Sequence, residues 1–457
     1  MAHGTHGRAG DAGHHVLVDG KTGETLRSPT VTTQLQPSAE PAARDPDRVF
    51  WTLAHLIDED FLREAYRHTS KSSAAGIDGV TAPPYAEHLD DNLRDLHERL
   101  RSERSQAAPV ERVWMEKEDG RQRPIGKPTF EDKMGQRAVA MRLEAIDEQD
   151  VSDGSYGFRP GRSPHDALHE LRERCMTEGL GWIVDADIRG YFDSIDRTHL
   201  RDVLRTRGNA GGLWRLIGQW RRAGVMEEGV LSHPETGGVQ GGGISPVLAT
   251  IFLHHGLDAW FEREVRLRMQ GRCFLIRFAD DCVIGCALAA DARTIMAVLP
   301  KRLGRFGLTI PPTKTALVSF RKPNGHKPAG MEHGTCDFLG CTHDWTQSRP
   351  GSWVSKRRTA RKRLRHTKQA LWRWGRTHRH APVKDQYQRL SLKLRGPFQD
   401  DGIRGKCRLL EVIHHYAEKA WRYWRSRCSS KSAIRWEKFQ QLLETSVLPL
   451  PRIVHNI

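Results

Sequence analysis

The stretch RFADDCVIG (residues 277–285) places two adjacent aspartates, Asp280 and Asp281, inside a run that is otherwise suited to burial. Like charges are expensive to bury unless a cation holds them, because an unpaired buried charge normally neutralises. A divalent metal ion is the simplest explanation. The alternative is a hairpin tip, where Asp-Asp is ordinary solvated turn chemistry. The flanking runs, CFLIRFA and CVIGCAL, are typical of two strands.

A second stretch supplies another acid. VDADIRGYFDSI (residues 184–195) begins as a strand, predicted over residues 182–188, and carries Asp187 just before the turn at Gly190. Three carboxylates from two adjacent strands suit a two-metal phosphoryl-transfer site, because two Mg²⁺ ions need oxygen ligands that bridge and neutralise them. Asp185 shares the face of Asp187 by the two-residue period of a strand, so geometry alone does not exclude it. We rank Asp185 as a supporting residue because it lies one pleat back from the turn.

A third stretch, GVQGGGISPVLATIFLH (residues 238–254), opens an apolar helix with a glycine triplet. Glycines there let a nucleotide or a template strand approach the backbone closely. The pair Ser245-Pro246 suits the start of the helix. Glycine-rich loops are common, so this segment indicates a functional site only in combination with the other two stretches.

Length and composition limit the class of protein. The chain of 457 residues has no apolar run long enough to span a bilayer and no signal peptide, and its eight cysteines form no secreted framework. We therefore expect a soluble cytoplasmic protein without membrane contacts. The formal net charge of +16 predicts a polyanionic partner, most often nucleic acid.

The basic residues cluster near the C-terminal quarter of the chain. Residues 356–380 contain eleven Lys or Arg and no acidic residue. An apolar stripe at Ala360, Leu364, Leu371 and Trp374 predicts one helix over this segment, with a core face and a basic face that tracks phosphates. A nuclear-localisation segment or a merely solvated helix is the alternative.

Patterning along the chain predicts an α+β protein. Residues 1–46 have no periodicity and are predicted to be a disordered leader. Short apolar runs alternate with helical patterns from about residue 112 to 345, and beyond the break at 348–353 the chain is helical and basic. We place a domain boundary at that break.

In chain order, DIRGYFD, QGGGISP and FADD resemble the palm motifs of reverse transcriptases, and specifically those of bacterial group II intron-encoded proteins. The resemblance extends over nearly everything after the leader. Further segments similar to that family are GIDGV (76–80), RPIGKPTFEDKMGQ (123–136), SYGFRPGRSPHDAL (155–168), GLTIPPTKT (307–315), DFLG (337–340), RGPFQDDGIRG (395–405) and LPLPRIVH (448–455).

The resemblance implies a right-hand polymerase with fingers, palm and thumb. It divides the chain into an N-terminal segment and fingers over 47–180, a palm with finger elements over 181–347, and a mostly helical, RNA-binding thumb or maturase domain over 348–457. The chain stops without the Cys- and His-rich endonuclease segment of some members. We therefore expect the chain to belong to an element that does not nick the second strand of its target.

The resemblance also implies roles for individual residues. Asp187 and Asp280 would ligate both catalytic Mg²⁺ ions, with Asp281 completing the site. Phe192 matches the steric gate that excludes a ribose 2′-OH, and core packing is its alternative role. Arg123 and Lys117 match contacts to the triphosphate, and Gln240 and Gly241 match contacts to the nucleotide and template. Lys314 matches a palm lysine that protonates pyrophosphate, and a surface lysine is its alternative role. Arg159 and Arg162 match template-backbone contacts, and a structural role is their alternative.

Three positions depart from the family pattern. GVQGGG (238–243) replaces a usual Thr-Pro-Gln-Gly-Gly start, a change at the entry of the loop and not at its contact residues. FADD replaces the commoner Tyr-Ala-Asp-Asp, which keeps the ring and loses a hydroxyl. FQDDG (398–402) replaces a usual pair of tyrosines, and stacked aromatics commonly hold RNA bases. Asp400 and Asp401 therefore bring part of the expected RNA-binding surface into question.

The predicted function is an RNA-directed DNA polymerase that also acts as a maturase. Its expected partners are group II intron RNA, a DNA target or primer, and dNTPs, and the expected mechanism is target-primed reverse transcription. One alternative is an RNA-binding splicing factor whose polymerase site has decayed, although all three aspartates remain. Another is a reverse transcriptase of a defence or diversity-generating lineage.

Overall fold

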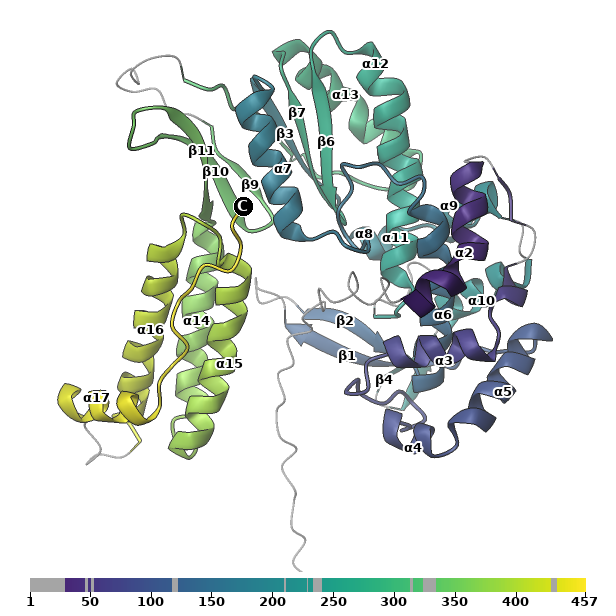
Figure 1. Ribbon diagram of the computed structural model, residues 1–457, viewed down its shortest axis with the longest axis horizontal. Coiled ribbons are helices and arrows are strands. Elements are labelled where there is room, and N and C mark those ends of the chain that lie inside the picture. The colour runs from purple at the N-terminus through teal and green to yellow at the C-terminus, as the bar shows by residue number, and fades with distance from the viewer. Residues whose placement is uncertain are drawn as a thin grey trace, which may run out of the picture.

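Helices and strands are mixed along the chain, which confirms the predicted α+β class (Figure 1). No helix of the described part of the chain is both long enough and apolar enough to cross a membrane. The computed structural model describes residues 29–45, 48–50, 53–116, 122–208, 211–227, 229–232, 241–312, 315–323, 334–428 and 434–457.

The central sheet is built from the strands predicted around the aspartates. Its four strands run in the order β6-β7-β3-β8, and every neighbouring pair is antiparallel. One face packs on α7, and the other joins the main core with α11 and α13. Because both faces are covered, the strands read as continuous apolar runs. The elements are β3 (Trp182–Asp187), β6 (Cys273–Phe278), β7 (Asp281–Cys286), β8 (Ala316–Ser319), α7 (Pro164–Thr177), α11 (Ser245–Leu253) and α13 (Ala289–Gly304).

A second sheet of order β2-β1-β4-β5 lies beside a group of helices. Its strands β1 and β2 form a long antiparallel hairpin, and β4 joins β1 in parallel. The strands are β1 (Val110–Glu116), β2 (Gln122–Lys127), β4 (Val225–Glu227) and β5 (Val230–Ser232). The remaining elements before residue 270 are α2 (Pro29–Arg44), η1 (Ala54–Leu56), α3 (Glu59–His68), α4 (Ala82–Glu87), α5 (Leu89–Arg101), α6 (Phe130–Asp147), α8 (Tyr191–Ser194), α9 (Arg197–Arg207), α10 (Gly211–Arg222), the π-helical turns η2 (His254–Asp258) and η3 (Phe261–Val265), and α12 (Arg266–Arg268).

The prediction of a disordered leader is wrong for its last part, because Pro29–Arg44 form α2. Arg142, a buried residue of α6, provides the reason. Its guanidinium donates to Gln34 O at 2.6 Å and lies 3.8 Å from the ring centre of Phe61. Burial lowers the pKa of Arg142 to about 10. A helix without strong local signals is thus fixed by a partner more than one hundred residues away in the sequence.

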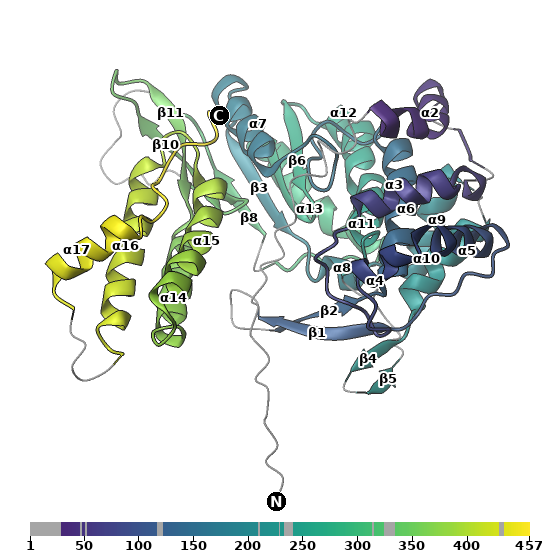
Figure 2. The same ribbon diagram turned by 60° about the horizontal axis from the view of Figure 1, so that its bottom comes forward.

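The C-terminal part has its own core. A three-stranded antiparallel sheet of order β11-β10-β9 leads into four helices, which both views show gathered in a lobe apart from α2–α6 (Figure 1, Figure 2). The predicted boundary at residue 348 falls in the turn of the β10–β11 hairpin. The elements are β9 (Cys336–Phe338), β10 (Cys341–Gln347), β11 (Trp353–Thr359), α14 (Arg361–Thr377), α15 (Val383–Asp401), α16 (Cys407–Arg425) and α17 (Trp436–Thr445).

The single helix predicted over residues 356–380 is wrong at its start. Residues 356–359 complete β11, and α14 begins at Arg361. The alternation of β11 buries Arg357, which donates to the carbonyl of Ile457. Of the predicted stripe, Leu371 and Trp374 do face the helical core. The two-residue period of the strand could not be recognised in the sequence, because basic residues occupy consecutive positions at the end of β11.

The segment LPLPRIVH (448–455) runs back along the end of α15. The backbone N–H groups of Val454 and His455 both donate to Gly402 O, at 2.7 and 2.8 Å. The ring of His455 stacks on that of His165, the second residue of α7, with 3.6 Å between centroids. This segment therefore joins the helical lobe to the central sheet's covering helix.

Replacing His343 by leucine should protect the fold against acid. The imidazole on β10 is fully buried, and neither ring nitrogen has a hydrogen-bond partner among the described residues. Burial, reinforced by the charge of Arg357, lowers its pKa to about 3. Below the ordinary value near 6.5 only the unfolded chain takes up the proton, so stability is lost as the pH falls from there towards 3.

At pH 5 this one group should cost the wild type about 2 kcal/mol relative to neutral pH. The measurement is the free energy of unfolding between pH 7 and 5 for wild type, His343→Leu and His169→Leu, a control at an exposed position on α7. Equal losses in all three proteins would contradict the prediction.

Candidate functional site

The structure brings the three predicted acidic residues to one end of the central sheet. Asp187, the last residue of β3, lies opposite Asp281, the first residue of β7. Asp280 precedes Asp281 in the two-residue turn between β6 and β7. The pKa of Asp280 is raised by burial and further by the charge of Asp187, while the charge of Arg123 opposes the rise. Close packing of like charges is the condition under which a cation stabilises a site.

The donor set at this end fits a magnesium ion, since it consists of carboxylate oxygens. In the part of the chain that the structure describes, no group of three or more His, Cys, Asp or Glu side chains is placed to hold a metal ion by itself. Magnesium is commonly bound by one or two carboxylates together with substrate phosphates and water. Asp187 and Asp281, paired across the strands, therefore supply two carboxylates that fit such an ion.

Backbone strain marks the same turn. Ala279 has φ of 57°, in the left-handed region that costs an L-residue roughly 1–2 kcal/mol. Two-residue turns of this kind usually have glycine there. A strained conformation persists only where the surroundings enforce it, and such positions cluster at functional sites.

A loop before α7 encloses the turn. Residues 154–157 run beside β6, where Tyr156 N donates to Arg277 O and Arg277 N donates to Gly154 O, both at 2.8 Å. Gly157 packs against the turn itself, because a Cβ there would lie within 3.0 Å of the backbone N of Ala279. The SYGF segment thus forms an isolated parallel bridge to β6 at the edge of the central sheet.

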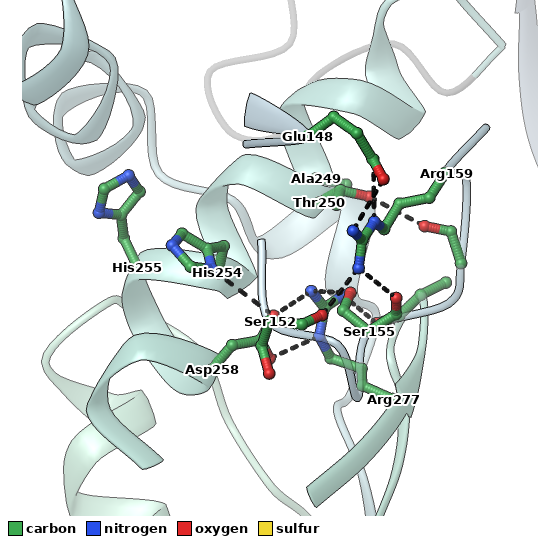
Figure 3. A network of polar contacts seen from close by, with 12 residues as sticks. Glu148, Ser152, Ser155, Arg159, Ala249, Thr250, His254, His255, Asp258 and Arg277 are labelled. Carbon is green, nitrogen blue, oxygen red and sulfur yellow. Dashed lines mark hydrogen bonds and ion pairs between the residues drawn. The ribbon is translucent and has the colours of Figure 1, made fainter. Parts of the chain in front are cut away.

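Two charged residues that the sequence reasoning missed lie beneath the turn. Arg277 and Asp258 are 0% and 1% exposed and form a two-pronged ion pair, with 2.8 Å between Nε and Oδ1 (Figure 3). Arg277 also donates to the carbonyl of Ala279 at 2.9 Å. An arginine inside the apolar run CFLIRF was the available signal, because a buried charge needs a partner.

Phe192 lies beside this site on the short helix α8. Its ring is half-buried and packs edge-on against Phe158, with 6.4 Å between centroids. Phe158 in turn contacts Phe278 of the FADD motif. The neighbouring Tyr191 is fully buried and donates to Ala249 O. Phe192 therefore keeps a partly open ring and is linked to the FADD motif through Phe158.

Arg123 and Gly241 come from the finger sheet and the glycine loop. Arg123 is exposed on β2, and its charge reaches Asp280. Gly241 has φ of 122°, and a Cβ there would collide with Gly126 O of the same strand. The loop and the strand therefore lie against one another. The predicted residues Lys117, Gln240 and Lys314 lie outside the described residues.

Of the two roles expected for Arg159, its contacts favour the structural one over a template contact. Its side chain is 5% exposed, pairs with Glu148 at 2.8 Å, and donates to the carbonyls of Ser152 and Ser155 at 2.7 Å (Figure 3). Its donors are directed inward, so it stabilises the loop. Arg162 remains a candidate, since it is only partly covered by Asp153.

Asp185 lies behind the aspartate turn, as expected. It is half-buried, and burial raises its pKa to about 6, with the charges of Asp337 and Asp187 acting in the same direction. Asp337 belongs to the DFLG segment on β9. The two motifs therefore meet at the back of the candidate site.

The two acids of FQDDG have structural partners. Asp401 is buried, and its Oδ1 accepts hydrogen bonds from Thr359 at 2.9 Å and from Lys406 at 3.0 Å. Asp400 pairs with Arg363 of α14 at 2.9 Å. These acids hold the end of α15 against the start of α14.

Comparison with known proteins gives a consistent result. Residues 115–343 match the family model described as reverse transcriptase (RNA-dependent DNA polymerase). The chain is 34% identical over 220 residues to protein YkfC of Escherichia coli, a match that covers 47% of this chain and 58% of YkfC. It is 32% identical over 210 residues to the group II intron-encoded protein LtrA of Lactococcus lactis, covering 46% of this chain and 35% of LtrA.

A third relative is an uncharacterized 91 kDa protein in a cob intron of Schizosaccharomyces pombe. It is 30% identical over 316 residues, with 58% of this chain and 39% of that protein covered. The matches therefore span between about a third and three fifths of the length of these relatives.

Proposed function

The chain belongs to the reverse transcriptase (RNA-dependent DNA polymerase) family, and from this premise we propose that it extends a DNA primer along an RNA template. Family membership implies the right-hand polymerase fold, and we assign the thumb to residues 348–457. The observation that carries the proposal is the pairing of Asp187 with Asp281 at the end of the sheet, with Asp280 in the adjacent turn.

In the proposed mechanism, Asp187, Asp280 and Asp281 would hold two Mg²⁺ ions. When bound, the ions lower the pKa of the primer 3′-OH and stabilise the charge that develops on the pyrophosphate. Arg123 orients the triphosphate by bidentate hydrogen bonds. Lys117, Gln240 and Lys314 keep the roles that the family resemblance assigns to them.

Primer extension tests the proposal directly. The purified chain should add dNTPs to a DNA primer annealed to an RNA template when Mg²⁺ is present. A folded chain that binds RNA and adds no nucleotide would favour the splicing-factor alternative instead.

Replacing Phe192 by valine should let the enzyme accept ribonucleotides. The smaller side chain removes the ring that we place against the sugar, so the ratio of kcat/KM for dNTP to that for rNTP should fall by about 10²-fold. Phe158 and Tyr191 keep the local packing. Single-nucleotide incorporation with each substrate measures the ratio, and a ratio equal to that of the wild type would return Phe192 to a packing role.

We further propose that the helical lobe binds group II intron RNA, assists its splicing and supports target-primed copying. LtrA, one relative, is named a group II intron-encoded protein. Cations lie over rings in this lobe. Between α14 and α16, Lys368 Nζ is 5.4 Å from the ring centre of Tyr416, and just after α16, Arg427 Cζ is 3.7 Å from that of Tyr423. Basic groups next to aromatic rings suit phosphates and unpaired bases.

Charge removal on α14 should weaken RNA binding in a salt-dependent way. Arg365 and Arg376 are exposed on this helix, and replacing both by glutamine should reduce the slope of log Kd against log salt by about 0.7 per lost phosphate contact. The matched control changes two exposed basic residues of α13, Arg293 and Lys301, to glutamine. Equal slopes for the two double variants would place the RNA elsewhere.

A further inference from the structure

Arg277 connects four separate segments beneath the aspartate turn. Its donors reach Asp258 of η2, Ser155 of the SYGF loop at 2.8 Å, and the carbonyl of Ala279 at 2.9 Å, while its backbone belongs to β6 (Figure 3). The side chain is fully buried. Nothing in the proposed chemistry uses a charged group at this position.

The contact to Ala279 is the informative one. The carbonyl of Ala279 and the backbone N–H of Asp280 belong to a single planar peptide unit. A donor that holds this carbonyl therefore sets the orientation from which the Asp280 side chain extends. The left-handed φ of Ala279 shows that the peptide is kept away from its preferred conformation.

Asp258 and Ser155 fix the guanidinium in turn. Asp258 takes two of the donors, and Ser155 is held by Arg159, whose NH1 donates to its carbonyl at 2.7 Å. Asp258 ends a π-helical turn, a distortion frequent at functional sites. Ligand orientation by surrounding hydrogen bonds is a recognised determinant of metal affinity.

We propose that Arg277 is a positioning residue that fixes the orientation of Asp280 through the Ala279 carbonyl and thereby sets the affinity of the aspartate site for its divalent ions. The inference rests on the proposed function, since it concerns the same metal site. Only a guanidinium supplies flat, diverging donors for three partners, and an ammonium group does not reproduce that geometry.

The test compares Arg277→Lys with Arg302→Lys in the full-length chain. Arg302 is a matched control, because its guanidinium donates to His255 O and Gly256 O of the same π-helical turn. It also lies over the rings of Trp260 and Phe306. Mn²⁺ alone serves as the probe. Its affinity is measured by the paramagnetic resonance of free Mn²⁺, in the presence of an RNA–DNA primer–template whose own binding is measured separately.

Arg277→Lys should weaken Mn²⁺ binding about tenfold or more and raise the Mg²⁺ concentration for half-maximal extension to match. Primer–template affinity should not change, and Arg302→Lys should resemble the wild type in both metal measurements. Ser155→Ala, which removes one acceptor and leaves the ion pair intact, should weaken Mn²⁺ binding by a smaller factor. If Arg277→Lys does not fold, Ser155→Ala is used to test the inference instead.

Wild-type Mn²⁺ affinity in Arg277→Lys, or in Ser155→Ala if that variant carries the test, would overturn the inference. A wild-type chain that binds no Mn²⁺ at this site would overturn it as well. If the wild type binds Mn²⁺, the variant loses it, and neither makes DNA, the positioning role stands and the polymerase proposal fails. The two failures are therefore distinguishable.

Discussion

Replacing Asp280 by asparagine should abolish DNA synthesis and, at the same time, make the protein more stable. Asparagine keeps the shape and removes the charge, so the extension rate should fall by about 10³-fold or more, the effect expected when a preorganised charged group is lost from a reaction centre. The pKa of Asp280 is raised by burial and by Asp187, which means that the folded state disfavours its ionised form. At neutral pH, removing that charge should therefore raise the melting temperature.

The expected fall in extension rate and rise in melting temperature of Asp280→Asn have opposite signs, which separates a functional role from a structural one. Single-turnover incorporation gives the rate, and thermal unfolding in metal-free buffer gives the stability. Asp202→Asn, an exposed position on α9, is the control and should alter neither quantity. An Asp280→Asn chain that extends primers within tenfold of the wild type would exclude this turn as the metal site.

Replacing Gly157 by alanine should cost both activity and stability. The new Cβ would lie within 3.0 Å of the backbone N and Cα of Ala279, so the SYGF loop or the aspartate turn must move. Overpacking of this kind costs about 1–3 kcal/mol of unfolding free energy. Displacement of a catalytic group by about 1 Å costs about 10²-fold in rate.

Gly304→Ala is the matched control for that variant. Gly304 ends α13, and a Cβ added there would meet no atom of the described residues within 4 Å. Alanine at this position should therefore be neutral or stabilise the helix by up to about 1 kcal/mol. Rates and denaturant midpoints of the two variants give the comparison. An active, stable Gly157→Ala chain would mean that the loop yields without disturbing the aspartates.

The central sheet was predictable because its sequence signals are local. Apolar runs bounded by turn residues gave β3, β6 and β7 to within two residues of their observed ends, and the period of two put Asp185 behind Asp187. The order of motifs then supplied the family. The convergence of the three acidic residues could be predicted because like charges in a buried setting need a common cation.

Most of the features that sequence patterning missed share one physical cause, which is that a local pattern does not identify the partner of a charged side chain. α2 needs Arg142, and the inward role of Arg159 needs Glu148 and the loop carbonyls. The ion pair between Arg277 and Asp258 joins a strand to a π-helical turn that no local pattern predicts. The residue types indicated that each buried charge needs a partner, but only the folded structure shows which residue that partner is.

The loop over residues 154–157 has a consequence for association between molecules. β6 is the outermost strand of the central sheet, and an uncovered outer strand offers a row of free N–H and C=O groups to any other chain. By pairing with both the N–H and the C=O of Arg277, the loop occupies part of that row. The contacts that orient the aspartate turn thus also keep a highly apolar strand from templating aggregation.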